Sequence, residues 1–253
     1  MNSLEAVLKR DRHIVVATIF GLVALSWAYL VLMVRGLNTG AMAMMVAPDA
    51  WNSQVAVTMF LMWTIMMVGM MLPSAAPMIL LFAALARQGR EARQVHSRTL
   101  IFLGGYLVVW TAFSAAATAL QWWLSSLELL SPMMIGTSSR LNGALLIAAG
   151  VFQWLPIKTA CLRHCQSPAT FLTQHRRPGL VGALAMGAHH GAFCLGCCWA
   201  LMLLLFVGGV MNILWIAALA IFVLIEKLVP WGTLFGRVGG ALLVIGGLVL
   251  ATR

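Results

Sequence analysis

Long apolar runs joined by short connections constrain this chain more than any other feature. Such runs lie at about residues 14–34, 54–86, 99–124, 139–157, 179–207, 209–229 and 233–251. A helix of ~20 apolar residues crosses the hydrocarbon core of a bilayer, and it satisfies its own backbone hydrogen bonds there. Only 9% of the residues are charged, against roughly 25% in soluble proteins. We therefore predict an all-α, polytopic transmembrane helical bundle with about seven spans, six to eight being possible.

The second run, at 54–86, is longer than one straight span needs. Pro73 and Pro77 lie inside it, and proline removes a helical hydrogen bond, so we expect a break or a tilt there. No linker, repeat or low-complexity tract divides the chain. We predict a single membrane domain over residues 1–253.

Basic residues gather on one side of the predicted spans. Thirteen of the 16 Lys and Arg residues fall there, and Arg35, Arg140 and Arg253 fall on the other side. The positive-inside rule then places the N-terminus in the cytoplasm, and we predict a multi-pass protein of the bacterial cytoplasmic membrane. Because topology explains the net charge of +10, the expected partner is the lipid bilayer and no nucleic acid.

The fifth run carries thiols and imidazoles at membrane depth. His190, Cys194 and Cys197 are spaced i, i+4, i+7, which places them on one face of a helix. Cys198 borders this face, and His189 is offset from it by ~100°. Cysteine packs well as a small apolar residue, but buried imidazoles need partners. We therefore favour a metal site at these five residues over plain packing.

Two further groups of soft ligands accompany this run. Met66, Met67, Met70 and Met71 lie in the second run, and thioethers suit Cu(I), although methionine is also a common core residue. Cys161, His164 and Cys165 follow the fourth run with a spacing that occurs among zinc ligands. Membrane-surface cysteines, with or without acylation, are the alternative for this last group.

Glu226 and Lys227 stand near the inner end of the sixth run. An intramembrane carboxylate indicates a functional site. A pair whose charged ends reach the membrane surface is an equal alternative.

Four segments together resemble a bacterial family known only as predicted metal-binding integral membrane proteins. The segments are Met66–Pro77, Lys158 to Pro168 with its two cysteines, Gly187 to Met202 with Cys-Leu-Gly-Cys-Cys-Trp, and Glu226-Lys227. The resemblance covers most of the chain from the second run onward. It implies metal binding through the cysteines and histidines of these segments.

The soft ligands together predict a membrane protein that transports, captures or delivers copper(I), with zinc as the second choice. Met42, Met44 and Met45 are expected to capture the ion outside, and a metal chaperone or metalloenzyme client is the expected protein partner. A metal-handling role is favoured over an enzyme. The alternatives are a thiol–disulfide oxidoreductase that uses Cys194 and Cys197 and a haem protein that uses His189 or His190.

Overall fold

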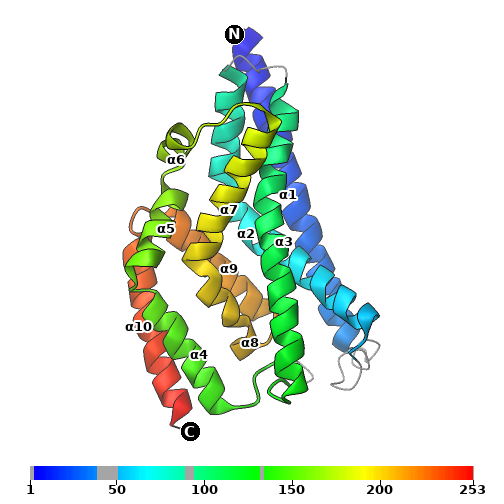
Figure 1. Ribbon diagram of the computed structural model, residues 1–253, viewed down its shortest axis with the longest axis vertical. Coiled ribbons are helices and arrows are strands. Elements are labelled where there is room, and N and C mark those ends of the chain that lie inside the picture. Colours follow the sequence, from blue (N-terminus) through cyan, green and yellow to red (C-terminus); the bar gives the residue numbers. More distant parts are fainter. Residues whose placement is uncertain (1–2, 39–50, 89–93, 132–133, 253) are drawn as a thin grey trace.

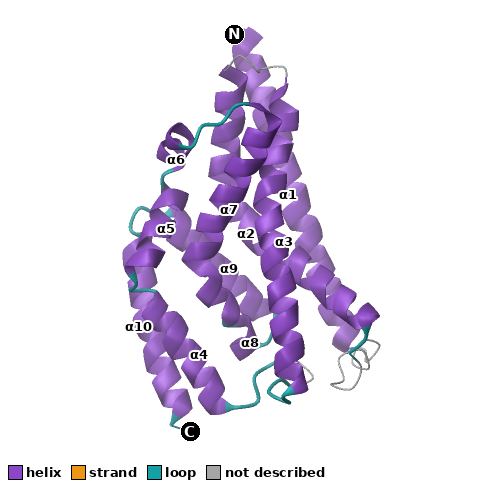
Figure 2. Cartoon of the chain, in the orientation of Figure 1, coloured by secondary structure: helices purple, strands orange, loops and turns teal. Residues whose placement is uncertain are grey.

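The chain folds into an elongated bundle of helices (Figure 1). The computed structural model describes residues 3–38, 51–88, 94–131 and 134–252. Figure 2 shows that regular structure in these residues is helical. The helices are α1 (Ser3–Asn38), α2 (Ser53–Gln88), α3 (Val95–Ser126), α4 (Ser139–Phe152), α5 (Pro156–Gln166), α6 (Pro168–Gln174), α7 (Gly179–Leu203), α8 (Leu205–Gly208), α9 (Ile213–Leu228) and α10 (Gly232–Ala251). The predicted all-α class is confirmed.

The described residues contain five or six candidate membrane spans. Five stretches are long and apolar enough to cross a bilayer, and they belong to α1, α2, α3, α7 with α8, and α10. Helices α4 and α5 pass the same test together as one span with a bend of 64°. A count of six lies within the predicted range of six to eight, and the central figure of seven is not reached because α9, in the run at 209–229, has only 16 residues. At 1.5 Å per residue it is about 24 Å long, shorter than the ~30 Å core.

The bend between α4 and α5 interrupts the run predicted at 139–157. Helix α4 ends at Phe152 and α5 begins at Pro156. Leu155 has an extended backbone with ψ of 140°, which is the conformation favoured before proline. The chain therefore turns at this point, and α5 packs against α7 instead of continuing α4.

Helix α2 continues through Pro73 and Pro77, so the predicted break does not occur, and the alternative of a tilt there stays a prediction. Proline at position 73 leaves the carbonyl of Gly69, one turn earlier, without its helical donor. The indole Nε1 of Trp27 in α1 donates to this carbonyl at 3.3 Å. The hydrogen bond lost within α2 is thus replaced by one from a neighbouring helix, as happens in membrane helices.

Glycines allow two helix pairs to approach closely. Helix α3 packs along α7, and α4 packs along α10 (Figure 1). A Cβ atom added at Gly105 would collide with the backbone of Leu184, and one added at Gly143 would lie 2.7 Å from the carbonyl oxygen of Gly247. Small residues at such contacts are typical of helix association in membranes.

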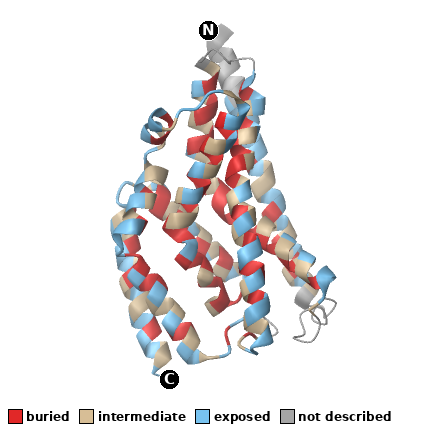
Figure 3. Ribbon diagram, in the orientation of Figure 1, coloured by how far each residue is buried: buried red, intermediate tan, exposed pale blue. Residues whose placement is uncertain are grey.

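Buried side chains concentrate on the central helices. Figure 3 shows them on α2 and α7, whereas few of the described residues of α1 and α10 are buried. The buried methionines of α2 include all four predicted ligands, and each of these is at most 1% exposed. The described core therefore lies around α2, α7 and the part of α3 between them.

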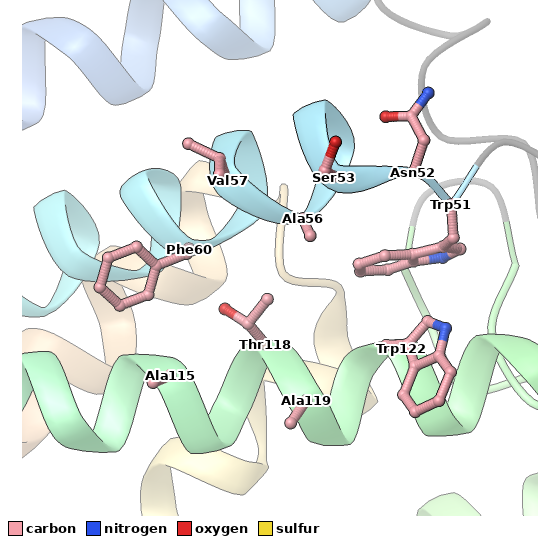
Figure 4. A pocket seen from close by; sticks show the side chains of 10 residues that line it. All are labelled: Trp51, Asn52, Ser53, Ala56, Val57, Phe60, Ala115, Thr118, Ala119 and Trp122. Carbon is pink, nitrogen blue, oxygen red and sulfur yellow. The ribbon is translucent and has the colours of Figure 1, made fainter.

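A hollow of about 580 Å³ lies between the start of α2 and the end of α3. Trp51 and Trp122 lie on opposite walls of it, and Phe60 and Ala115 line its far end (Figure 4). None of its lining residues carries a thiol, an imidazole or a charge. The soft-ligand chemistry of the chain is therefore located elsewhere.

Candidate metal centre

All five cysteines of the chain come together from α5 and α7. Cys194, Cys197 and Cys198 on α7 are buried, and Cys161 and Cys165 on α5 are partly exposed. The side chain of Cys165 lies close to those of Cys194 and Cys197. Residues predicted as two separate groups thus form one cluster, which we call the thiol cluster.

Glycine at position 196 lets α5 approach α7 beside this cluster. A Cβ atom at Gly196 would lie 2.9 Å from the sulfur of Cys161. Cys161 therefore lies directly against the α7 backbone at Gly196, the residue before Cys197. The sulfur atoms run from the partly exposed α5 to the buried face of α7.

The predicted helical face of α7 is confirmed as a buried face. Met186, His190, Cys194 and Cys197 all point into the interior. The ring centroid of His190 lies 5.7 Å from that of Tyr106 and 5.6 Å from that of Phe171. These rings pack against the imidazole, so haem ligation would require them to move.

His190 has an unused polar atom. Its side chain is only 2% exposed, and its Nδ1 has no hydrogen-bond partner among the described residues. A buried polar atom without a partner costs about 1–3 kcal/mol. The Nδ1 atom is therefore available to a ligand that binds next to the thiols.

The ammonium group of Lys227 on α9 contacts the thiol cluster. Its Nζ donates to the sulfur of Cys194 at 2.9 Å. The same Nζ lies 4.0 Å from the Cys198 sulfur and 3.4 Å from the hydroxyl oxygen of Ser74 on α2. The hydroxyl of Tyr106 on α3 lies 3.1 Å from the Cys194 sulfur. Cys194 on α7 is therefore the sulfur that side chains from both α3 and α9 contact.

A buried ion pair holds α5 in place beside this cluster. Lys158 on α5 pairs with Glu226 on α9 at 2.6 Å and also donates to Gln153. Both charged side chains are almost fully buried, at 2% and 1% exposure. Glu226 and Lys227 therefore do not reach the membrane surface: the first binds α5 and the second binds the thiols.

The thiol cluster is not a preformed cage. Cys197 and Cys198 direct their sulfurs to the carbonyl oxygen of Cys194, at 3.1 and 3.0 Å. Within the described part of the chain, no three His, Cys, Asp or Glu side chains are arranged to hold one ion. A structural zinc site needs four ligands in a tetrahedron. The arrangement suits a soft ion that is satisfied by few ligands.

The other predicted ligands lie outside the thiol cluster or deeper in the core. His189 is exposed and packs with His175, at 4.5 Å between ring centroids, and His175 lies 6.4 Å from His164. Met71 is linked to the cluster through its carbonyl oxygen, which accepts from Tyr106 at 3.1 Å. Met66, Met67 and Met70 are buried on the same helix. Met42, Met44 and Met45 lie outside the described residues.

Sequence reasoning missed three residues of this region. Tyr106 lies in an apolar run without any motif, and His175 stands alone in a polar segment. Lys158 was counted among the charges that set the topology, although it is buried. The cue for Lys158 was its position two residues after Pro156, where the chain turns back into the bundle.

The chain matches one protein-family model, which is described as PpoB2: Copper chaperone. The match covers residues 60–250, about three quarters of the 253 residues. It includes α7, α9 and α5, which carry the cysteines, His190 and Lys227. No curated protein and no solved structure matches the chain significantly.

Proposed function

This chain belongs to the PpoB2 copper chaperone family, and we propose that it holds Cu(I) at the thiol cluster within its membrane bundle. Copper is the metal of the family, and thiolate and thioether sulfurs are the ligands that Cu(I) prefers. The observation that carries the proposal is the convergence of all five cysteines from α5 and α7 beside the unpartnered Nδ1 of His190.

Cys194 and Cys197 are the two thiolate ligands in this proposal, and His190 is their neutral neighbour. These residues share the buried face of α7. Binding requires the Cys197 sulfur to turn away from the carbonyl oxygen of Cys194, which costs one weak hydrogen bond. Cu–S bonds replace it.

Cys165 and Cys161 are the exchange ligands. They are partly exposed, and Cys165 already lies close to Cys194 and Cys197. An ion on the α7 thiolates therefore has a nearby sulfur on α5 to which it moves before it leaves the protein. Cys198 is an additional buried sulfur of the thiol cluster that can join the ligands. Thioethers along α2 are supplied by Met66, Met67, Met70 and Met71.

The setting is the bacterial cytoplasmic membrane, with the N-terminus in the cytoplasm. The distribution of Lys and Arg in the loops supports this orientation, even though Lys158 and Lys227 are buried and no longer count toward it. The client is a metalloenzyme or another copper-carrying protein. His164 and His189 lie near the α5 end of the cluster, where such a client is expected to dock.

Metal content of the purified protein tests the proposal. The full chain is purified in detergent under reducing conditions, loaded with Cu(I), desalted and measured for copper and sulfur by mass spectrometry. We expect stoichiometric copper in the unchanged protein and its loss in Cys194→Ala and Cys197→Ala. Met33→Leu is the matched control, because it removes a buried sulfur from α1, which packs chiefly against α2.

Two results would contradict the proposal. Copper that remains in both cysteine variants would mean that the ion binds elsewhere. Metal-free protein in which Cys194 and Cys197 form a reducible disulfide would instead support a thiol–disulfide oxidoreductase.

A further inference from the structure

Lys227 is a buried cation whose partners are thiols. It is 3% exposed, and within the described residues it makes hydrogen bonds to Cys194, Cys198 and Ser74. The nearest carboxylate in the sequence, Glu226, is bound to Lys158. A buried charge is costly unless an opposite charge compensates it. The ammonium group therefore needs a negative charge from the thiol cluster.

Among the described residues around Lys227, the sulfurs are left to supply that charge, because Glu226 is already paired with Lys158. Ser74 from α2 and Tyr106 from α3 are neutral hydroxyls beside it or beside Cys194. Helix α7 contributes Cys194 and Cys198, and α5 contributes Cys165. A complex formed on these sulfurs must therefore carry one net negative charge to be neutral together with Lys227.

A charge count then separates monovalent from divalent ions. Two thiolates and a monovalent ion carry one net negative charge, and Lys227 neutralises it. Two thiolates and a divalent ion are already neutral, so Lys227 would leave the buried site with one positive charge. His190 adds a ligand atom without changing this count.

We propose that Lys227 makes the thiol cluster selective for monovalent soft ions, Cu(I) and Ag(I), over divalent ions such as Zn(II). This inference rests on the proposed function, because it assumes that Cys194 and Cys197 are the thiolate ligands. Lys227 acts as a charge partner that touches the ligand Cys194 at 2.9 Å. It adds a charge criterion to the preference for soft ions that the sulfurs already provide.

Competition between Cu(I) and Zn(II) in Lys227 variants tests the inference. The full chain is equilibrated without oxygen in buffered mixtures of both ions, and the ratio of bound copper to bound zinc is measured after desalting. At an effective dielectric constant of about 20, a unit charge 4–5 Å away changes an equilibrium constant by about a hundredfold or more. We expect Lys227→Met to lower the ratio by about a hundredfold, and Lys227→Arg to retain it.

Arg237→Met is the matched control. It removes one positive charge from an exposed position on α10, so the ratio should not change. A ratio is also insensitive to partial loss of folded protein, because both ions are measured in the same molecules. The ultraviolet absorption of the Cu(I)–thiolate bonds reports independently whether the sulfurs still bind.

The unchanged protein provides a test that needs no variant. Ag(I) should displace bound Cu(I) with equal stoichiometry, whereas excess Zn(II) should leave it bound. Displacement by zinc, or an unchanged ratio in Lys227→Met, overturns the inference. If Cu(I) remains dependent on Cys194 and Cys197 in those experiments, only the role of Lys227 is wrong. If copper binding does not depend on these cysteines, the proposed function itself fails.

Discussion

The buried pair of Lys158 and Glu226 makes a sharp prediction about stability. Lys158 Nζ lies 2.6 and 2.8 Å from the two carboxylate oxygens of Glu226. Removing one partner of a buried pair leaves an uncompensated charge and costs about 3–5 kcal/mol. Glu226→Leu leaves Lys158 with Gln153 as its remaining acceptor. We therefore expect a loss near the lower end, about 3 kcal/mol.

The double variant Lys158→Met with Glu226→Leu should be clearly more stable than Glu226→Leu alone. Replacing both partners of a buried pair by apolar residues of similar volume is often neutral or stabilising. We expect the double variant to recover at least about 2 kcal/mol of the loss, although Gln153 then loses its donor.

Thermal unfolding in detergent, followed by the fluorescence of the 10 tryptophans, measures both variants. A loss of about 3 kcal/mol lowers Tm by roughly 6–12 °C in a chain of this size. An unfolding temperature of Glu226→Leu equal to that of the unchanged protein would contradict the stabilising role of the ion pair. A double variant that is less stable than the single one would contradict the cost assigned to the unpaired Lys158 charge.

Three further predictions concern packing, thioethers and protons. Gly105→Ala should destabilise the protein by about 1–3 kcal/mol, because its methyl group meets the α7 backbone. The matched control Gly104→Ala should be neutral or slightly stabilising, because a Cβ there meets open space. The unfolding temperatures of the two variants test this difference. Met70→Leu should cost less than about 1.5 kcal/mol of stability, but it should weaken Cu(I) binding measured by competition with a chelator. A Cu(I) affinity equal to that of the unchanged protein would show that Met70 is not a ligand. Copper occupancy should fall from neutral to mildly acidic pH, since protons compete for thiolates; occupancy that is constant over this range contradicts thiolate ligation.

The helical character of the chain and one face of its site followed from local sequence patterns. Apolar runs predict spans because their length matches a bilayer. The i, i+4, i+7 spacing predicts that His190, Cys194 and Cys197 share a face, because helix geometry depends only on neighbouring residues. Both predictions are confirmed.

Predictions that depended on interruptions of a helix were less successful. The chain was expected to break at Pro73 and Pro77, but Trp27 from another helix satisfies the carbonyl that Pro73 leaves free. It was expected to continue through residues 139–157, but the extended Leu155 before Pro156 turns it by 64°. Proline therefore interrupts the chain at position 156 but not at position 73, where a side chain from another helix supplies the missing hydrogen-bond donor.

The apolar runs and the spacing of cysteine and histidine are enough to predict a helical membrane protein with soft ligands on α7 and α5. The packing of the helices brings the two cysteine groups into one thiol cluster and turns Glu226 and Lys227 to different partners. Local patterns miss this because helix periodicity fixes directions within one helix only. The distance between sulfurs on two helices depends on how α5 turns after Pro156 and how closely Gly196 lets it approach.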